Sequence, residues 1–433
     1  MSEPAICYTY PQPLTQKSAT SPGSNFNQQG GSIFNQRRHP FFGSEPVRNP
    51  WVVVLALSLG PAVSNGLARF AYALILPAMQ SDLHWTYTEA GWLNTANAIG
   101  YLLGAIGTLW AVRSVGAGTL FRLGMLVVTL ALLVSGISRD IGLLSFLRIL
   151  AGLAGAPVFI CGGVLAAALF PAGDGRAGNA IALYFGGAGA GLLLSGIVLP
   201  LWFDQAGPTG WSIAWIALGI LSAFCVPLTW WASRQVGGLP AGHSEPLLGV
   251  WRNFLPALIG YGFFGAGYMI YMTFVVAWAR NAGAGVGAVI ALWSLLGLAV
   301  LASPFVWRPL LTRWSGQTCL ALSIGLTGCG VAVAWAMPTN TGLQASAIIF
   351  GLSFFIVPSA ATALVRSSLP KAQWAPAVAF FTVVFAASQT VGPIAAGWIA
   401  DRSGSLSSGL LLGLGLLAAG TLAAGAQPSR ALE

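Results

Sequence analysis

The stretch IGLLSFLRILAGLAGAPVFICGGVLAAALF, residues 141–170, carries a single formal charge, Arg148. About 20 apolar residues are enough for a helix to cross the roughly 30 Å hydrocarbon core of a membrane. Residues 51–79 form a second such stretch, and its single formal charge is also basic, Arg69. A lone charge in hydrocarbon is costly, so it usually faces the interior of a helix bundle or a water-filled cavity. The two arginines therefore predict membrane helices around a positively charged interior.

The composition assigns the whole chain to membrane proteins. Charged residues make up 7% of its 433 residues, hydrophobic residues make up 56%, and the mean hydropathy is +0.76. A soluble domain has about 25% charged residues. The apolar runs lack the period-2 alternation of a transmembrane β-barrel, so we expect an all-α membrane protein. The sequence predicts twelve transmembrane helices: Trp51–Met79, Ala90–Ala111, Thr119–Ile137, Ile141–Phe170, Ala180–Phe203, Trp211–Ala232, Phe254–Ala279, Val286–Val306, Thr318–Met337, Leu343–Leu364, Val378–Ala400 and Leu406–Ala426.

The lengths and prolines of these spans bear on their shape. The first and fourth are long enough to require a tilt or a kink. The prolines that fall within spans include Pro61, Pro157, Pro227, Pro256, Pro304, Pro358 and Pro393. Inside a bundle, neighbouring helices can satisfy the carbonyls that a proline frees, so we predict continuous spans at these positions.

The basic residues predict the orientation. Most of the 19 Lys and Arg lie in segments on the side of the two termini. Cytoplasmic loops are enriched in Lys and Arg, so we expect both termini in the cytoplasm and the protein in the inner membrane of a bacterium. This distribution also explains the net charge of +9 without a nucleic-acid partner. Residues 1–49 are rich in Pro, Gln, Ser, Asn and Gly and are predicted to be a disordered cytoplasmic tail.

No enzyme signature is evident in the sequence. The five cysteines are scattered and contain no CxxC pair, and the three histidines lie in predicted loops or the tail. Neither a metal site nor a disulfide framework follows from this spacing. We therefore expect no catalytic residues, no metal and no cofactor.

A faint internal repeat divides the chain into two halves. Residues 180–207 align without gaps with residues 377–404, which pairs Asp204 with Asp401. The repeat predicts two six-helix bundles, residues 50–232 and 254–433, joined by a cytoplasmic linker at residues 233–253. Halves related by a pseudo-two-fold axis along the membrane normal are typical of transporters that hold their substrate between the halves at mid-depth.

The chain from about residue 50 onward resembles the major facilitator superfamily. RILAGLAG at residues 148–155 is similar to that superfamily's Arg-x-x-x-Gly-x-x-Gly motif, and GPIAAGWIADRSG at residues 392–404 matches another familiar pattern. The loop after the second span keeps Arg113 and Gly116 of the usual signature but lacks its Asp. The resemblance implies a secondary transporter.

A narrower resemblance is to the YbfB/YjiJ group of that superfamily. The similar segments are GLARFAY at residues 66–72, NTANAIGY at residues 94–101 and GFFGAGYMI at residues 262–270. The substrates of the group are poorly defined, so this resemblance implies a transporter without naming its cargo.

Polar residues in the first two spans are candidates for a substrate site. At α-helical spacing, Asn65, Arg69 and Tyr72 share one face. The same spacing puts a second polar set on one face of the next span, namely Asn94, Asn97 and Tyr101. Both faces are predicted to line the translocation path. The alternative is that these residues form hydrogen bonds between helices, as polar residues in membranes commonly do.

Arg148 and the second half leave further alternatives open. In one interpretation, Arg148 is a second contact for an anion or part of a coupling relay. In the other, its guanidinium is capped by helix carbonyls or by neighbouring polar residues. In the second half, no charged residue aligns with Arg69 or Arg148. Its wall of the cavity is therefore predicted to consist of uncharged residues that either contact the substrate or pack: Tyr268, Tyr271, Trp293 and Gln389.

Three functions are compatible with these features. The favoured one is a secondary membrane transporter that moves a small polar or anionic organic solute by alternating access, with coupling to a proton or a counter-solute. An exporter of drugs or metabolites is the second, although a cavity without carboxylates argues against cationic cargo. A transporter-like membrane sensor that does not transport is the third. The predicted spans contain no Asp, Glu or His to act as a proton relay.

Overall fold

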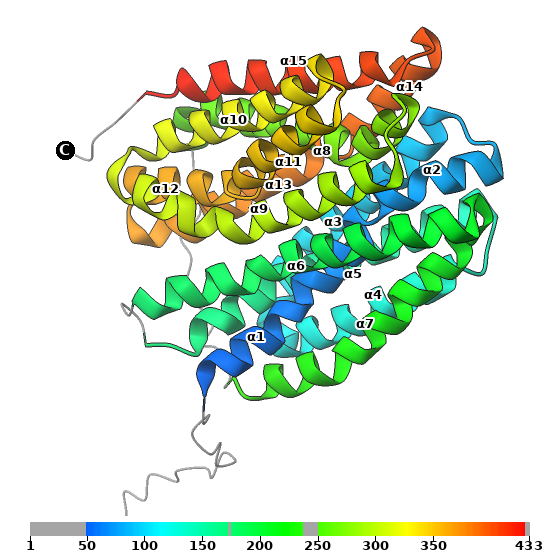
Figure 1. Ribbon diagram of the computed structural model, residues 1–433. Helices are drawn as coiled ribbons and strands as arrows, with labels where there is room; N and C mark the ends of the chain where they lie inside the picture. Colours follow the sequence, from blue (N-terminus) through cyan, green and yellow to red (C-terminus); the bar gives the residue numbers. More distant parts are fainter. Residues whose placement is uncertain (1–48, 172–174, 237–249, 429–433) are drawn as a thin grey trace, which may run out of the picture. The chain divides into compact units, whose positions relative to one another are not determined.

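The computed structural model describes residues 49–171, 175–236 and 250–428, all within one compact unit (Figure 1). The predicted tail, apart from Asn49, and most of the predicted linker at residues 233–253 lie outside the described residues.

Across the described ranges, twelve helical segments are long and apolar enough to cross a membrane. They coincide with the twelve predicted spans, and most extend a few residues further at one or both ends. This confirms an all-α membrane protein.

The first six spans (blue to green in Figure 1) run from α1 to α7. Their elements are α1 Pro50–Pro61, the π-helix η1 Ala62–Phe70, α2 Tyr72–Leu83, α3 Tyr87–Val115, α4 Ala117–Ser135, α5 Ile141–Ala168, α6 Gly175–Ala206, the short 3₁₀ turn η2 Pro208–Gly210, and α7 Trp211–Arg234.

The second six spans (green-yellow to red in Figure 1) run from α8 to α15. Their elements are the short 3₁₀ turn η3 Val250–Phe254, α8 Leu255–Asn281, α9 Val286–Arg313, α10 Gly316–Ala336, α11 Asn340–Phe354, α12 Val357–Ser368, α13 Lys371–Ser388, α14 Gly392–Ser403, and α15 Leu406–Gly425.

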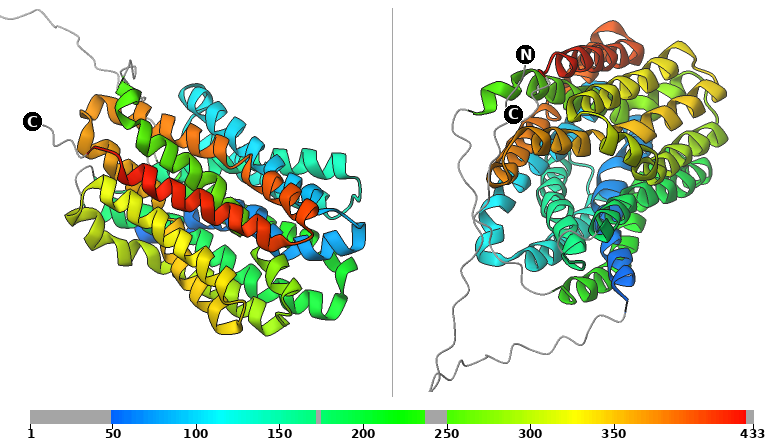
Figure 2. Two further views of the ribbon diagram at one scale, coloured as in Figure 1. Left: turned by 90° about the horizontal axis from the view of Figure 1, so that it is seen from above. Right: turned by 90° about the vertical axis from the view of Figure 1, so that its left-hand side faces the viewer.

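The two halves meet along pairs of helices from opposite halves. α6 packs on α9, α3 packs on α13 and α14, and α2 packs on α8. The right-hand view of Figure 2 shows the yellow and red helices above the blue and cyan ones. Each span contains an 18-residue stretch hydrophobic enough to cross a membrane. In the first span 72% of this stretch is buried inside the protein and in the seventh 83%, against 33% in the second and twelfth. The first and seventh spans are therefore central.

Glycine allows the close approach of α6 to the second half. A Cβ atom on Gly189 would lie 2.7 Å from the carbonyl oxygen of Gly297 on α9. Only a residue without a side chain permits this backbone contact, since real Cβ atoms rarely come so near. A smooth contact of this kind lets two membrane helices pack closely.

α5, α7 and α9 continue through Pro157, Pro227 and Pro304 as predicted. Three other spans are interrupted, which corrects the prediction for Pro61, Pro358 and Pro393. In the first span, α1 ends at Pro61 and a π-helix follows, in which the Ala71 N–H donates to the carbonyl of Gly66. The tenth and eleventh spans break just before α12 and α14, whose second residues are Pro358 and Pro393. Proline lacks an N–H group and clashes with the preceding turn, so it is tolerated at a helix start better than inside.

Candidate functional site

Arg69 lies at the centre of a polar contact between the two halves. Its side chain is 4% exposed, and its Nη2 donates to Oε1 of Gln389, the residue that ends α13. The Tyr268 hydroxyl on α8 donates to the same oxygen at 3.0 Å. The ring of Tyr101 lies 4.8 Å from the guanidinium carbon. One buried cation from the first half thus contacts uncharged groups, Tyr101 of its own half and Gln389 of the second, and Tyr268 binds the same Gln389 oxygen.

One donor of this guanidinium is unused. Nε of Arg69 has no hydrogen-bond partner among the described residues, although it is buried. Buried polar atoms are nearly always paired, so an orphan of this kind calls for an explanation such as a missing ligand or water.

The interruptions of the three broken spans converge at this place. Arg69 lies in the π-helix of the first span, and its partner Gln389 lies at the break of the eleventh. The adjacent Phe70 contacts Phe354, the last residue before the break of the tenth span, with ring centroids 6.1 Å apart. Interrupted helices at mid-span are where transporters commonly bind substrates.

Arg148 occupies a different environment, entirely within the first half. Its side chain is 3% exposed, Nη1 donates to the carbonyl of Ala68, and Nε donates to that of Leu93 at 3.5 Å. Its guanidinium carbon lies 4.9 Å from the ring of Tyr72 and 5.5 Å from that of Trp215. Helix carbonyls thus cap two of its nitrogens and tie three spans together, while its buried Nη2 has no hydrogen-bond partner among the described residues.

The prediction that Asn65, Arg69 and Tyr72 share one face is wrong for Tyr72. It assumed α-helical spacing, whereas Ala62–Phe70 is a π-helix with a wider turn. Tyr72 points towards the carbonyl of Ala90, to which its hydroxyl donates at 2.8 Å. Asn65 accepts a hydrogen bond from the adjacent Ser64 at 3.1 Å, whereas Arg69 donates to Gln389 of the second half.

The polar residues of the second span divide between the two surfaces of α3. Asn94 donates to Thr273 on α8 at 2.6 Å, and Tyr101 covers Arg69, so both lie at the contact between the halves. Asn97 donates to the backbone carbonyl of Arg148 at 3.1 Å and belongs to the first half.

The four candidates of the second half also divide. Tyr268 and Gln389 join Arg69. The hydroxyl of Tyr271 lies 2.7 Å from that of Ser346, and its ring packs on a phenylalanine within the same half, so it lies apart from Arg69. Trp293 packs against Gly196 at the contact of α6 with α9, and its indole N–H has no partner in the described part of the chain.

Sequence reasoning missed the aromatic neighbours of the site. Phe264 and Phe385 stack against Tyr268, with centroids 5.0 and 5.7 Å away. A signal for them exists, because residues 261, 264 and 268 recur at helical spacing on one face of α8 and Phe385 lies one turn before Gln389.

At the end of the bundle opposite the chain termini, Asp401 joins α14 to the start of α3. Its carboxylate accepts from the N–H of Tyr87 at 2.9 Å, from the N–H of Thr88 at 2.8 Å and from the Thr88 hydroxyl at 2.5 Å. These are unpaired donors of a helix N-terminus, where negative charge is favourable. We call this contact the Asp401 latch; it closes the two halves against each other at this end.

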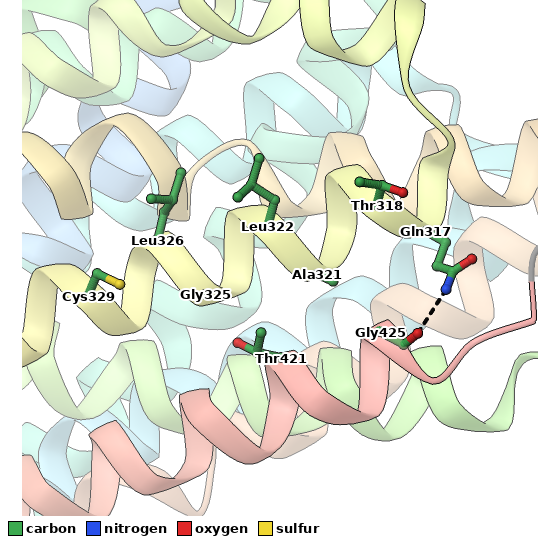
Figure 3. Close-up of a pocket in the computed structure, with 9 residues that line it drawn as sticks. All are labelled: Gln317, Thr318, Ala321, Leu322, Gly325, Leu326, Cys329, Thr421 and Gly425. Atoms are coloured by element: carbon green, nitrogen blue, oxygen red, sulfur yellow. Dashed lines mark hydrogen bonds between the residues drawn. The ribbon is translucent and has the colours of Figure 1, made fainter.

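A groove of about 520 Å³ lies between α10 and α15, away from both arginines (Figure 3). No charged side chain lines it, so it lacks the features of the Arg69 site. The residues that line it are Gln317, Thr318, Ala321, Leu322, Gly325, Leu326, Cys329, Thr421 and Gly425. Within the described ranges, no three His, Cys, Asp or Glu residues are grouped so that they could hold a metal ion.

Twelve spans in two packed halves, with interrupted helices meeting at a buried polar contact, define a membrane transporter architecture. The model of the family described as "Uncharacterised MFS-type transporter YbfB" matches residues 61–425, and the chain belongs to this family of the major facilitator superfamily. The predicted resemblance is thereby confirmed. The chain is a multi-pass membrane transporter and not an enzyme.

Solved transporters share the fold. A mutant of the nucleoside transporter NupG is similar with a TM-score of 0.68 and 15% identity, covering 87% of this chain and 99% of that one. A bacterial homologue of the human lysosomal transporter Spinster, inward-facing and occupied, is similar with a TM-score of 0.65 and 15% identity, covering 88% and 96%. At such identities the likeness establishes the fold alone. No curated protein matches the chain.

Proposed function

We propose that this protein is a secondary transporter that moves a small polar or anionic organic solute by alternating access, and that Arg69 binds the cargo. The observation that carries the proposal is a buried cation whose hydrogen-bond partner, Gln389, is neutral and comes from the opposite half. A buried charge is normally paired or hydrogen-bonded to charge, because desolvation is costly. Arg69 therefore lacks the anion that would best satisfy it.

A carboxylate fits the donors that surround Gln389 Oε1. If it took the place of that oxygen, it would accept from Nη2 of Arg69 and from the Tyr268 hydroxyl, and it would bring an acceptor to the unpaired Nε. A guanidinium and a carboxylate form paired, charge-assisted hydrogen bonds that are roughly twice as strong as neutral ones. The side-chain oxygen of Gln389 thus occupies the position that we propose for an oxygen of the cargo's carboxylate.

Alternating access follows from where these groups lie. Arg69 belongs to the first half, whereas Tyr268 and Gln389 belong to the second, so a bound anion contacts both lobes. The Asp401 latch closes one end of the path, and the buried state of Arg69 corresponds to a closed site. Opening must separate the halves at one end while the site stays central.

The proposed location is the inner membrane of a bacterium, with both termini in the cytoplasm. The supporting argument is the distribution of Lys and Arg in the sequence. For coupling, the described helices carry Asp and Glu only near their ends, at Asp82, Glu89, Asp204 and Asp401. We therefore infer that a co-transported proton would ride on the cargo itself, or that a counter-solute is exchanged.

The test is anion binding and uptake by the Arg69→Ala variant. Purified protein in proteoliposomes is assayed for uptake of radiolabelled organic acids, and in detergent for the rise in thermal stability that a selective ligand causes. We expect Arg69→Ala to lose both signals while remaining folded. The matched control is Arg139→Ala, since Arg139 is a 65% exposed arginine paired with Asp82 at 3.1 Å and far from the site in sequence. Saturable uptake of an acid by Arg69→Ala at the wild-type rate would refute the proposal.

A further inference from the structure

Resting on the proposed function, we propose that the cargo is a planar aromatic carboxylate, bound with its acid group on Arg69 and its ring against a wall of parallel aromatic rings. This aromatic wall consists of Tyr261, Phe264 and Tyr268 on α8, Phe354 on α11 and Phe385 on α13.

The rings of the aromatic wall share one orientation. Tyr261 and Phe264 are inclined by 8° to each other, Phe264 and Tyr268 by 14°, and Tyr268 and Phe385 by 13°. Their centroids are 6.0, 5.0 and 5.7 Å apart in the same order. Edge-to-face contacts are as favourable as stacked ones in general, so a column of near-parallel rings is a specific arrangement.

This column ends at the polar groups that would hold the acid. Tyr268 belongs to both, because its ring stacks in the wall and its hydroxyl bonds to Gln389 at 3.0 Å. Phe385 lies one helical turn before Gln389, whose Nε2 donates to the Phe385 carbonyl at 3.2 Å. The ring of Tyr101 also lies over the guanidinium of Arg69. A solute that displaced Gln389 would therefore have aromatic rings among its neighbours.

Burial singles out one ring of the wall as the contact surface. Tyr261, Phe264, Tyr268 and Phe354 are each at most 3% exposed, whereas Phe385 is only half-buried. A ring that packs solely as core would be covered like its neighbours. Phe385 stacks with Tyr268 and is the one residue of the wall that keeps accessible surface, so a planar body would join the stack at this residue.

Flat shape distinguishes this cargo from an aliphatic acid of equal size. An aromatic pair contributes an affinity of about 2- to 12-fold beyond the area it buries. A saturated ring is puckered and has no π face, so it forfeits that gain while keeping the bond to Arg69. Benzoate and cyclohexanecarboxylate form the matched pair of probes, and benzamide supplies the same aromatic ring without the charge.

The experiment measures affinities of the three probes for the full-length purified protein by thermal shift and calorimetry. We expect benzoate to bind about 2- to 12-fold more tightly than cyclohexanecarboxylate, with benzamide far weaker than both. Phe385→Leu should abolish the preference for the flat ring but retain carboxylate binding. Phe380→Leu on the same helix is the control, because Phe380 is 38% exposed and takes no part in the wall.

The outcomes separate this inference from the function on which it rests. Equal affinity for the two acids, with both lost in Arg69→Ala, overturns the aromatic cargo and leaves the anion carrier standing. Benzoate binding that survives Arg69→Ala refutes the anion site itself. A preference for benzoate that persists unchanged in Phe385→Leu, or no binding of benzoate at all, also overturns the proposal.

Discussion

Replacing Asp401 with alanine should loosen the closed end of the transporter and shift it towards the state open at that end. The substitution removes one carboxylate that accepts from the N–H groups of Tyr87 and Thr88 and from the Thr88 hydroxyl. Because α14 and α3 belong to different halves, these bonds exist only while the halves touch at this end. Their loss therefore acts on the open–closed equilibrium, with little effect on the folding of either half.

The magnitude follows from the helix N-terminus that Asp401 caps. Removing a capping side chain typically costs about 0.5–2 kcal/mol, and an acidic group near a helix N-terminus contributes about 0.3–1 kcal/mol at an exposed site. Thr86 and Glu89 also cap α3, within its own half, so the helix itself persists. We expect a loss of about 1–2 kcal/mol, which reduces the ratio of closed to open molecules by about 5- to 30-fold.

The assay is pulsed electron spin resonance between spin labels at the latch end of each half. Ile137 and Met337 are suitable positions, since they closely follow the ends of α4 and α10 at this end of the bundle and are 76% and 52% exposed. In a background without native cysteines, Asp401→Ala should increase the population with longer distances. Asp204→Ala is the control, because Asp204 is the residue aligned with Asp401 in the internal repeat and forms no hydrogen bond among the described residues. A distance distribution unchanged by Asp401→Ala, or changed equally by Asp204→Ala, would refute the latch.

Two further substitutions distinguish the arginines and the role of glutamine. Arg148→Ala should lower the folded yield and the melting temperature, because the carbonyls of Ala68 and Leu93 lose their donor. Each unsatisfied carbonyl costs about 1–3 kcal/mol of stability. A melting temperature within a degree of wild type would show that Arg148 does not tie the spans together. Gln389→Ala should destabilise the ligand-free protein by about 1–3 kcal/mol, since Arg69 loses its hydrogen-bond partner. It should also increase the rise in melting temperature that benzoate causes. An unchanged melting temperature without ligand, measured by light scattering or intrinsic fluorescence, would contradict this.

The sequence predicts the number and positions of the spans well, because hydropathy measures directly what a membrane requires of a helix. The division into halves also follows from it, through the repeat of residues 180–207 at residues 377–404. The breaks in three spans were not predicted. Pro61, Pro358 and Pro393 were visible, but whether a proline kinks a membrane helix or ends it depends on what neighbouring helices offer to the freed backbone groups.

Candidate site residues could be named from the sequence, but their pairing could not. Arg69 and Gln389 are 320 positions apart, and no local pattern links them. The π-helix reorients the side chains that α-helical spacing assigns to one face, so Tyr72 meets Arg148 and Tyr101 meets Arg69. The repeat likewise aligns Asp204 with Asp401, yet of these two only Asp401 bridges the halves among the described residues.

The three interruptions have a mechanical consequence. A continuous membrane helix resists bending along its whole length, so flexure concentrates where its hydrogen-bond ladder is broken. In this protein the interruptions of three spans lie close together, beside Arg69, Phe354 and Gln389. A solute bound there would contact all three interrupted helices and restrict their bending. We therefore expect the empty protein to flex more freely than the loaded one, with cargo governing the stiffness of the hinge as well as its position.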